Sequence, residues 1–260
     1  MWQQPLDSVS VKATPGSAEL ESDAPDMRGR IRRLRRFFLL LLLKTLWWDV
    51  VCSLGPLRWL RPAAEVRWAL LARQFAQLAS DLGGVLIKLG QFLSTRVDIL
   101  PQEVIQELTG LQDRIAPEPP GEIKAFLAVQ FGRPVSAVFA AFEEAPLGAA
   151  SLAQAHRARL PGGEPVVVKV LRPHIHRIVE ADLVVLGRVG RRLVWLRAVR
   201  ERLDMEQLLQ EFATTTRLEL DLLREKGELE QFAEDFRRRS EIHIPKVFAD
   251  FCLPAVLTLE

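Results

Sequence analysis

The 260-residue sequence predicts an α+β fold in which a helical region precedes a five-stranded antiparallel sheet. Three observations support this prediction. Residues 63–95 repeat apolar side chains at helical spacing. Strand-forming runs alternate with turns between Phe139 and Val170. Two further strand-like runs, 242–251 and 253–259, follow a second helical region.

The segment 139–170 is expected to form a three-stranded meander. Its first turn consists of small residues, from Pro146 to Ser151, and Pro161-Gly162-Gly163 provides the second. The third strand contains Lys169. Because side chains alternate along a strand, Lys169 shares one face with Val167, while Val166, Val168 and Val170 share the other. The sequence therefore predicts a lysine facing a cleft, with three valines packed behind it.

The predicted helices complete the order of elements. They span residues 63–95, 101–112, 121–131, 174–203 and 205–239. Gly83-Gly84 is expected either to bend the first of them or to allow close packing there. Three strands, a helix and two more strands are the plan of a protein-kinase N-terminal lobe, in which a third-strand lysine reaches the nucleotide phosphates and pairs with a helix glutamate.

Composition excludes several classes of function. The two cysteines, Cys52 and Cys252, are too few and too far apart for a cysteine-rich zinc site or a disulfide framework, and they fit a reducing compartment such as the cytoplasm. A net charge of +2 gives no argument for a nucleic-acid partner. We expect no metal site within this chain.

Four regions are expected along the chain: residues 1–27, a disordered arm; 28–60, a basic and then apolar segment; 61–135, a helical extension; and 136–260, the kinase-like lobe. Six arginines between Arg28 and Arg36 precede an apolar run that Lys44 and Asp49 interrupt, so it does not suit a spanning helix. An interfacial helix on an anionic membrane surface is one interpretation. A helix packed on its own domain, with solvated arginines, is the other.

Three motifs give the chain a family resemblance. Lys88-Leu89-Gly90-Gln91, the alanine-rich run 149–156, and Glu219-Leu220-Asp221 followed by Glu225 occur in the order found in one family. On these residues the chain resembles the UbiB/AarF (ABC1-type) family of atypical kinase-like proteins, over residues 63–260.

The resemblance implies a nucleotide site for ATP or ADP with Mg²⁺, and a role in isoprenoid-quinone (ubiquinone) biosynthesis at a membrane, with a prenyl-lipid substrate or quinone-biosynthesis proteins as partners. The nucleotide-binding residues would be Lys169, Glu225, Ala149, Ala150, Ser151 and Gln154. The helix with the first motif would lie across the cleft, and the residues there would be Lys88, Gln91, Glu219 and Asp221.

Spacing constrains how these charges can pair. Asp221 and Glu225 share a helix face at i and i+4, whereas Glu219 lies about 200° from Asp221 on an ideal helix. The simplest division gives Glu225 to Lys169 and leaves Glu219 or Asp221 for Lys88. Lys88 and Gln91 also fit a plain surface stripe. In the second strand, His156 is expected to bind a carbonyl at a strand end.

The sequence lacks residues that phosphoryl transfer requires. It contains no asparagine to hold magnesium, and Asp250-Phe251-Cys252, which imitates a metal-binding motif, falls between two predicted strands and is interpreted as a turn. We therefore expect a lobe that ends at the hinge, without its C-terminal lobe, catalytic residues or ATP turnover. The alternative is a non-catalytic membrane-surface scaffold that retains a degenerate kinase lobe.

Overall fold

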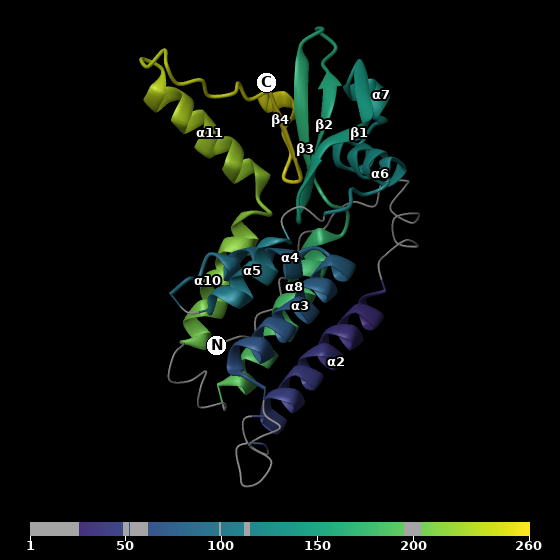
Figure 1. Cartoon of the computed structure of the whole chain (residues 1–260). Helices are drawn as coiled ribbons and strands as arrows, with labels where there is room; N and C mark the ends of the chain where they lie inside the picture. Colours follow the sequence, from purple (N-terminus) through teal and green to yellow (C-terminus); the bar gives the residue numbers. More distant parts are fainter. Residues whose placement is uncertain (1–25, 49–51, 53–61, 99, 112–114, 195–203) are drawn as a thin grey trace.

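The computed structural model describes residues 26–48, 52, 62–98, 100–111, 115–194 and 204–260. In Figure 1 a group of helices lies below a small sheet, and the chain passes between the two parts more than once. The expected disordered arm, up to residue 25, lies outside the described residues. So do most of residues 49–60 and the last part, 195–203, of one expected helix.

The helical part is built from six helices among the described residues: α2 (Met27–Leu46), α3 (Ala64–Leu82), α4 (Val85–Ser94), α5 (Gln102–Thr109), α8 (Ile175–Leu193) and α10 (Met205–Leu218). Their apolar faces meet in one core, whose fully buried members include Leu34, Leu86, Leu108, Val179 and Phe212. Burial of such side chains contributes about 1.5–3 kcal/mol each. This part of the fold therefore rests on helix packing.

The expected single helix 63–95 is two helices. Gly83 and Gly84 both have positive φ, 66° and 63°, and separate α3 from α4. Residues other than glycine rarely adopt this backbone conformation, so the two glycines allow the chain to turn sharply between α3 and α4. Gly83 ends α3 and donates its amide to the carbonyl of Ala79 at 2.8 Å.

Helix α2 packs against α8 through its inner face. Arg30 is nearly buried, with 9% of its side chain exposed, and its guanidinium binds Asp182 of α8, which is 0% exposed. It also donates to the carbonyls of Leu82 and Gly83 at 2.5 and 3.2 Å. The interpretation of this segment as a helix packed on its own domain is confirmed for this face, and one of the six arginines is not solvated.

Among the described residues the sheet has four strands, so the prediction of five is wrong. Strands β1 (Ala141–Ala149), β2 (Ala153–Arg159), β3 (Pro165–Leu171) and β4 (Val256–Leu259) are antiparallel in this order. Segment 242–251 makes only an isolated bridge, between Val247 and Leu259. Pro245 has no N–H to donate, and Ala249–Phe251 then turn into the 3₁₀ helix η3, so no ladder develops. The expected turn at Asp250 is confirmed.

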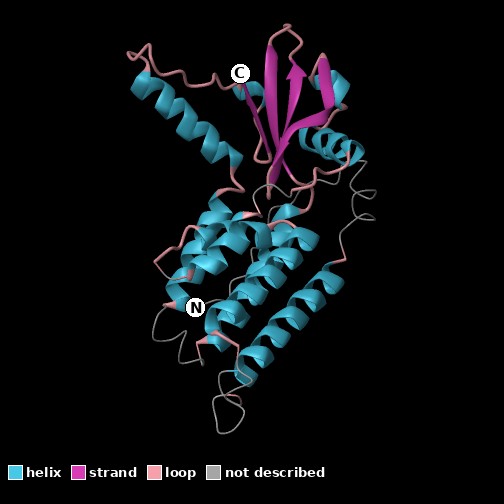
Figure 2. Ribbon diagram, viewed as in Figure 1, coloured by secondary structure: helices cyan, strands magenta, loops and turns pink. Residues whose placement is uncertain are grey.

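The two faces of the sheet differ. Val166, Val168 and Val170 are buried against α6 (Pro120–Phe131) and α7 (Val135–Val138), through residues such as Leu127. In Figure 2 these helices lie on one side of the sheet, and α11 (Leu222–Phe236) lies on the other. The predicted alternation along β3 is confirmed, because the valines are buried and Lys169 and Val167 are not.

Two boundaries near the proposed site differ from expectation. The helix expected over 205–239 is divided into α10 and α11 at Glu219–Asp221. Asp221 is the N-cap of α11, and its side chain accepts a hydrogen bond from the Arg224 amide at 3.0 Å. The first turn of the meander is also shorter than expected, because β1 continues to Ala149 through irregular pairing at Pro146 and Gly148.

Candidate functional site

Lys169 lies on the open face of β3 and pairs with α11. Its Nζ donates to both carboxylate oxygens of Glu225, at 2.8 Å to Oε1 and 2.6 Å to Oε2. The side chains are 36% and 37% exposed, so the pair is accessible to solvent on one side. This is the pairing that the sequence predicted. It holds an ammonium group at a defined place on a face that the α6–α7 core does not cover.

A second lysine–carboxylate pair joins the helices. Lys88 of α4 lies 2.5 Å from Glu219, the residue that ends α10. Of the two partners that the sequence left open for Lys88, the structure selects Glu219, because Asp221 is occupied in capping α11. Gln91 lies one turn further along α4 and is half-buried.

The glycine between Lys88 and Gln91 has a packing reason. A Cβ atom added to Gly90 would lie 2.2 Å from Cδ1 of Leu111, which is 1% exposed, and 3.5 Å from Phe75. Glycine therefore lets α4 approach its neighbours closely. The close approach fixes the helix that presents Lys88.

The alanine-rich turn joins β1 to β2 close to Lys169. The Ala150 amide donates to the Ala153 carbonyl at 2.7 Å, which closes the turn. Ala153 pairs with Leu171, and Ala155 pairs with Lys169. The turn therefore lies about two residues, or roughly 7 Å, along the sheet from the Lys169 position. Within the described part of the chain, the amides of Ser151 and Leu152 have no hydrogen-bond partner.

Gln154 does not face Lys169, and this corrects its expected contact with phosphate. The register pairs Gln154 with Val170 and His156 with Val168, which places both side chains on the buried face. Gln154 is 2% exposed, and its Oε1 accepts a hydrogen bond from the Glu118 amide at 2.8 Å. Its polar atoms are therefore already used inside the lobe.

His156 binds a carbonyl, as expected. Its Nδ1 lies 2.9 Å from the Glu143 carbonyl, and because a carbonyl only accepts, Nδ1 carries the proton. Nε2 then accepts from the Gln154 amide at 2.9 Å. Burial lowers the pKa of His156, which agrees with a neutral ring. The histidine is part of the lobe's internal support.

Arg172 is a residue to which the sequence patterns assign no role. It follows β3 directly and binds the alanine-rich turn and the proline-rich link before α6. Its partners lie 22 and 56 residues away, so no local pattern reveals them. The sequence feature that could have drawn attention to Arg172 is its charge, at a position between the strand that contains Lys169 and Pro173.

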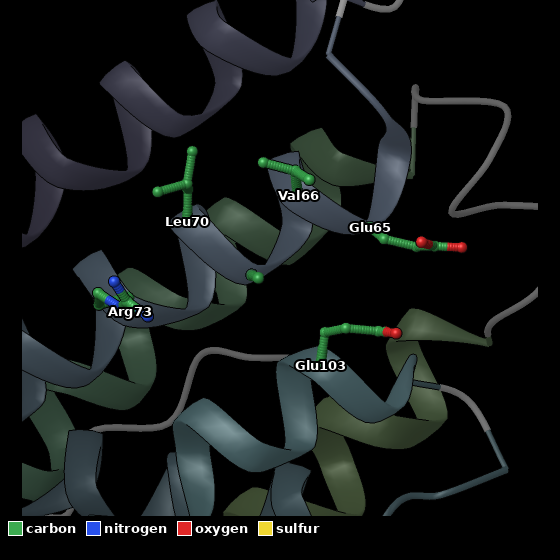
Figure 3. A pocket seen from close by; sticks show the side chains of 6 residues that line it. Glu65, Val66, Leu70, Arg73 and Glu103 are labelled. Carbon is green, nitrogen blue, oxygen red and sulfur yellow. The ribbon is translucent and has the colours of Figure 1, made fainter.

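A shallow hollow of about 320 Å³ lies elsewhere, between α3 and α5 (Figure 3). Glu65, Val66, Leu70 and Glu103 line it, together with Arg73, whose guanidinium is bonded to Glu107 at 2.5 Å. None of its lining residues belongs to the two lysine pairs. Among the described residues, no group of three or more His, Cys, Asp or Glu side chains is placed to hold a metal ion.

An antiparallel sheet whose third strand carries a lysine paired with a glutamate of a neighbouring helix is a feature of the kinase-like class. A family model described as the ABC1 atypical kinase-like domain matches residues 110–260, which is more than half of the chain. The chain therefore belongs to the UbiB/ABC1 family of atypical kinase-like proteins.

Curated relatives with the name "Probable protein kinase UbiB" agree with this assignment. The protein of Pseudomonas aeruginosa is 38% identical over 215 residues, and that of Pseudomonas entomophila is 39% identical over 217 residues. Each alignment covers 82% of this chain and 40% of the relative. The chain thus spans about two fifths of the length of these relatives.

One solved structure is also similar. It is the complex of Rv3197 with erythromycin from Mycobacterium tuberculosis, with a TM-score of 0.48 and 26% sequence identity. The match covers 76% of this chain and 49% of that one.

Proposed function

We propose that this chain is the nucleotide-phosphate-binding part of a UbiB-type atypical kinase. The observation that carries the proposal is the Lys169–Glu225 pair on the open face of β3. An ammonium group held by a carboxylate is suited to binding the phosphates of ATP or ADP. The turn formed by Ala149, Ala150 and Ser151 would add the backbone amide of Ser151 to the same phosphates.

Lys88, Gln91, Glu219 and Asp221 belong to the proposal as the residues on the helical side of this face. Lys88 and Glu219 connect α4 to the segment that precedes α11, so they link the helical extension to the helix that holds Glu225. In the proposed arrangement α4 occupies the region beside the nucleotide, where a protein substrate would otherwise bind. The whole protein would support isoprenoid-quinone biosynthesis and act on or near a prenyl lipid.

Magnesium and catalysis are not assigned to residues of this chain. The described residues offer no carboxylate cluster that fits Mg²⁺, and the sequence has no asparagine. The proposal for this chain is binding of nucleotide without turnover.

Titration with a fluorescent ATP analogue tests the proposal. We expect Lys169→Ala to weaken binding by at least about tenfold, which corresponds to about 1.4 kcal/mol, because the phosphate loses its ammonium partner. Lys226→Ala is the matched control, since Lys226 lies on the same helix and pairs with Glu230. Equal affinity of Lys169→Ala and wild type would contradict the proposed site. ATP hydrolysis by the purified chain would contradict the absence of turnover.

A second candidate function is a membrane-surface scaffold, which the outer face of α2 favours. Arg32, Arg35 and Arg36 are exposed on this face, and the next turns expose Leu39, Leu43 and Trp47. Cationic side chains followed by leucines and a tryptophan suit an anionic bilayer surface. Among the described residues no helix is long and apolar enough to cross a membrane.

Co-sedimentation with vesicles containing an anionic lipid tests this second function. We expect binding that falls when Arg32, Arg35 and Arg36 are replaced together by glutamine, because the surface attraction is lost. Replacement of the exposed Arg237, Arg238 and Arg239 is the control with the same change of charge. Absence of wild-type binding, or equal loss in both variants, would contradict a specific role for α2.

A further inference from the structure

We propose that Arg172 is a positioning residue for the alanine-rich turn, and that it fixes the direction in which the Ser151 amide points. The proposal rests on the proposed phosphate-binding function of this turn. Arg172 itself would not contact the nucleotide. It would act through the backbone of residues 150–152.

The contacts of Arg172 converge on the turn and on the link between α5 and α6. Its Nε donates to the Ala150 carbonyl at 3.0 Å, and its backbone amide donates to the Leu152 carbonyl at 2.9 Å. One terminal nitrogen donates to the Ala116 carbonyl at 2.7 Å, and the other binds the carboxylate of Glu118. The Arg172 side chain is only 12% exposed. One guanidinium thus holds three acceptors from two separate segments.

Because of the geometry of the peptide unit, the contact of Arg172 with the Ala150 carbonyl also orients the Ser151 N–H. The carbonyl of Ala150 and the N–H of Ser151 belong to one planar trans peptide, in which the two groups point in opposite directions. When Arg172 binds the carbonyl, the Ser151 N–H must point away from Arg172. Ser151 and Leu152 are only 6% and 4% exposed, and their amides have no hydrogen-bond partner among the described residues, so they are buried donors that a bound anion would satisfy.

The turn needs such a contact because it is built from alanine. Alanine adopts fewer backbone conformations than glycine, but it does not by itself choose between the α and β regions. The Ala150–Ala153 hydrogen bond closes the turn, and Arg172 fixes the carbonyl on its outer side. Together these contacts define one orientation of the peptide unit.

Glu118 extends the same support to the helical extension. It lies between Pro117 and Pro119, where the backbone is stiff, and its amide donates to the buried Gln154. Its carboxylate binds Arg172. The link before α6 is therefore attached both to β2 and to the turn. Lysine could not replace Arg172, because an ammonium group lacks the planar fork that reaches three acceptors.

Hydrogen exchange combined with nucleotide titration tests the proposal on the full chain. In Arg172→Gln we expect the backbone amides of residues 118, 150 and 172 to exchange on the order of tenfold faster, because the hydrogen bonds that they donate lose support. Binding of the ATP analogue should weaken about three- to tenfold. Arg172→Lys should not restore either property. Arg159→Gln is the control, since Arg159 donates to the Gly163 carbonyl at the other end of β2.

The outcomes separate the positioning role from the proposed function. Unchanged exchange of these amides in a folded Arg172→Gln variant would overturn the proposal, as would unchanged nucleotide affinity once exchange has increased. If Arg172→Gln exchanges faster but the wild-type chain binds no nucleotide, Arg172 does position the turn and the proposed function is contradicted. If Arg172→Gln does not fold, Glu118→Gln removes the charged partner alone. Exchange of the same three amides should be faster in Glu118→Gln than in wild type, by a smaller factor than in Arg172→Gln. Exchange at the wild-type rate in Glu118→Gln would overturn the proposal.

Discussion

Helices α4 and α11 each present one member of a lysine–carboxylate pair, but they are held in different ways. Half of the ten residues of α4 are buried, including Val85, Leu86 and Ile87. Only Leu222 is buried among the fifteen residues of α11, and Phe232 is 52% exposed. Lys88 is therefore carried by a packed helix, whereas Glu225 is carried by a helix with little core of its own.

This difference indicates which side of the proposed site can adjust. A segment with few buried apolar contacts opens at a lower free energy than a packed one. The Lys169–Glu225 pair is then one of the few contacts that fix α11 on the sheet, while the Lys88–Glu219 pair adds to a position that packing already sets. Four predictions test this contrast.

The largest effect is expected at the corner where α4 begins. Arg30→Met leaves the carboxylate of Asp182 buried without its partner, and this should lower the free energy of unfolding by about 3–5 kcal/mol at neutral pH. Chemical denaturation of wild type and variant measures the change. A loss below about 1 kcal/mol would show that Arg30 does not hold this corner.

The loss should also depend on pH. Burial raises the pKa of Asp182 above its ordinary value, and Arg30 opposes this by binding the charged form. A raised pKa in the folded state means that stability is fully present below the unfolded pKa and is lost as pH rises through the folded pKa. Arg30→Met should therefore lose more stability at neutral pH than near pH 4. The double variant with Asp182→Asn is the control, and it should lose this dependence.

An intermediate effect is expected at two helix glycines. Gly90→Ala should destabilise the chain by about 1–2 kcal/mol, because the new methyl group meets the buried Leu111. Gly227→Ala in α11 meets nothing within 4 Å and should stabilise by up to about 1 kcal/mol through helix propensity. Thermal unfolding of both variants measures the two signs. The same sign for both would contradict the contrast between the helices.

The smallest effect is expected at the ion pairs themselves. Both pairs are partly exposed to solvent, and solvent-accessible ion pairs contribute about 0.2–1 kcal/mol, so neither Lys169→Met nor Lys88→Met should change global stability by more than that. Hydrogen exchange should distinguish them: amides of α11 should exchange about two- to fivefold faster in Lys169→Met. Amides of α4 should be unaffected in Lys88→Met. Faster exchange of α4 there would show that the packed helix also depends on its pair.

Local sequence patterns predicted correctly those features that depend on a single helix or strand. The alternation in β3 was enough to place Lys169 opposite the three valines, because the two-residue period of a strand needs no tertiary information. The pairing of Lys169 with Glu225 came from motif order and is present in the structure. Its role in nucleotide binding stays a prediction.

Other features depend on contacts that periodicity does not encode. The apolar pattern runs on through Glu219–Asp221, although Asp221 has the side chain of a helix N-cap and does begin α11. Segment 242–251 has strand-forming residues, yet Pro245 and the η3 turn leave it one bridge. The family resemblance assigned Gln154 to the phosphates, but the register of β2, which places this side chain on the buried face, follows from strand pairing and not from the motif.

The corner between α3 and α4 has a consequence for sequence variation. At Gly83 an added Cβ atom would meet nothing within 4 Å, yet the positive φ of Gly83 and Gly84 makes other residues strained there. At Gly90 the backbone is an ordinary helix and only space is short. In a complete substitution library, large and small side chains at Gly83 should therefore destabilise the chain alike, whereas at Gly90 the loss of stability should increase with side-chain volume. The two profiles would tell a constraint on the backbone from a constraint on packing, without any further structure.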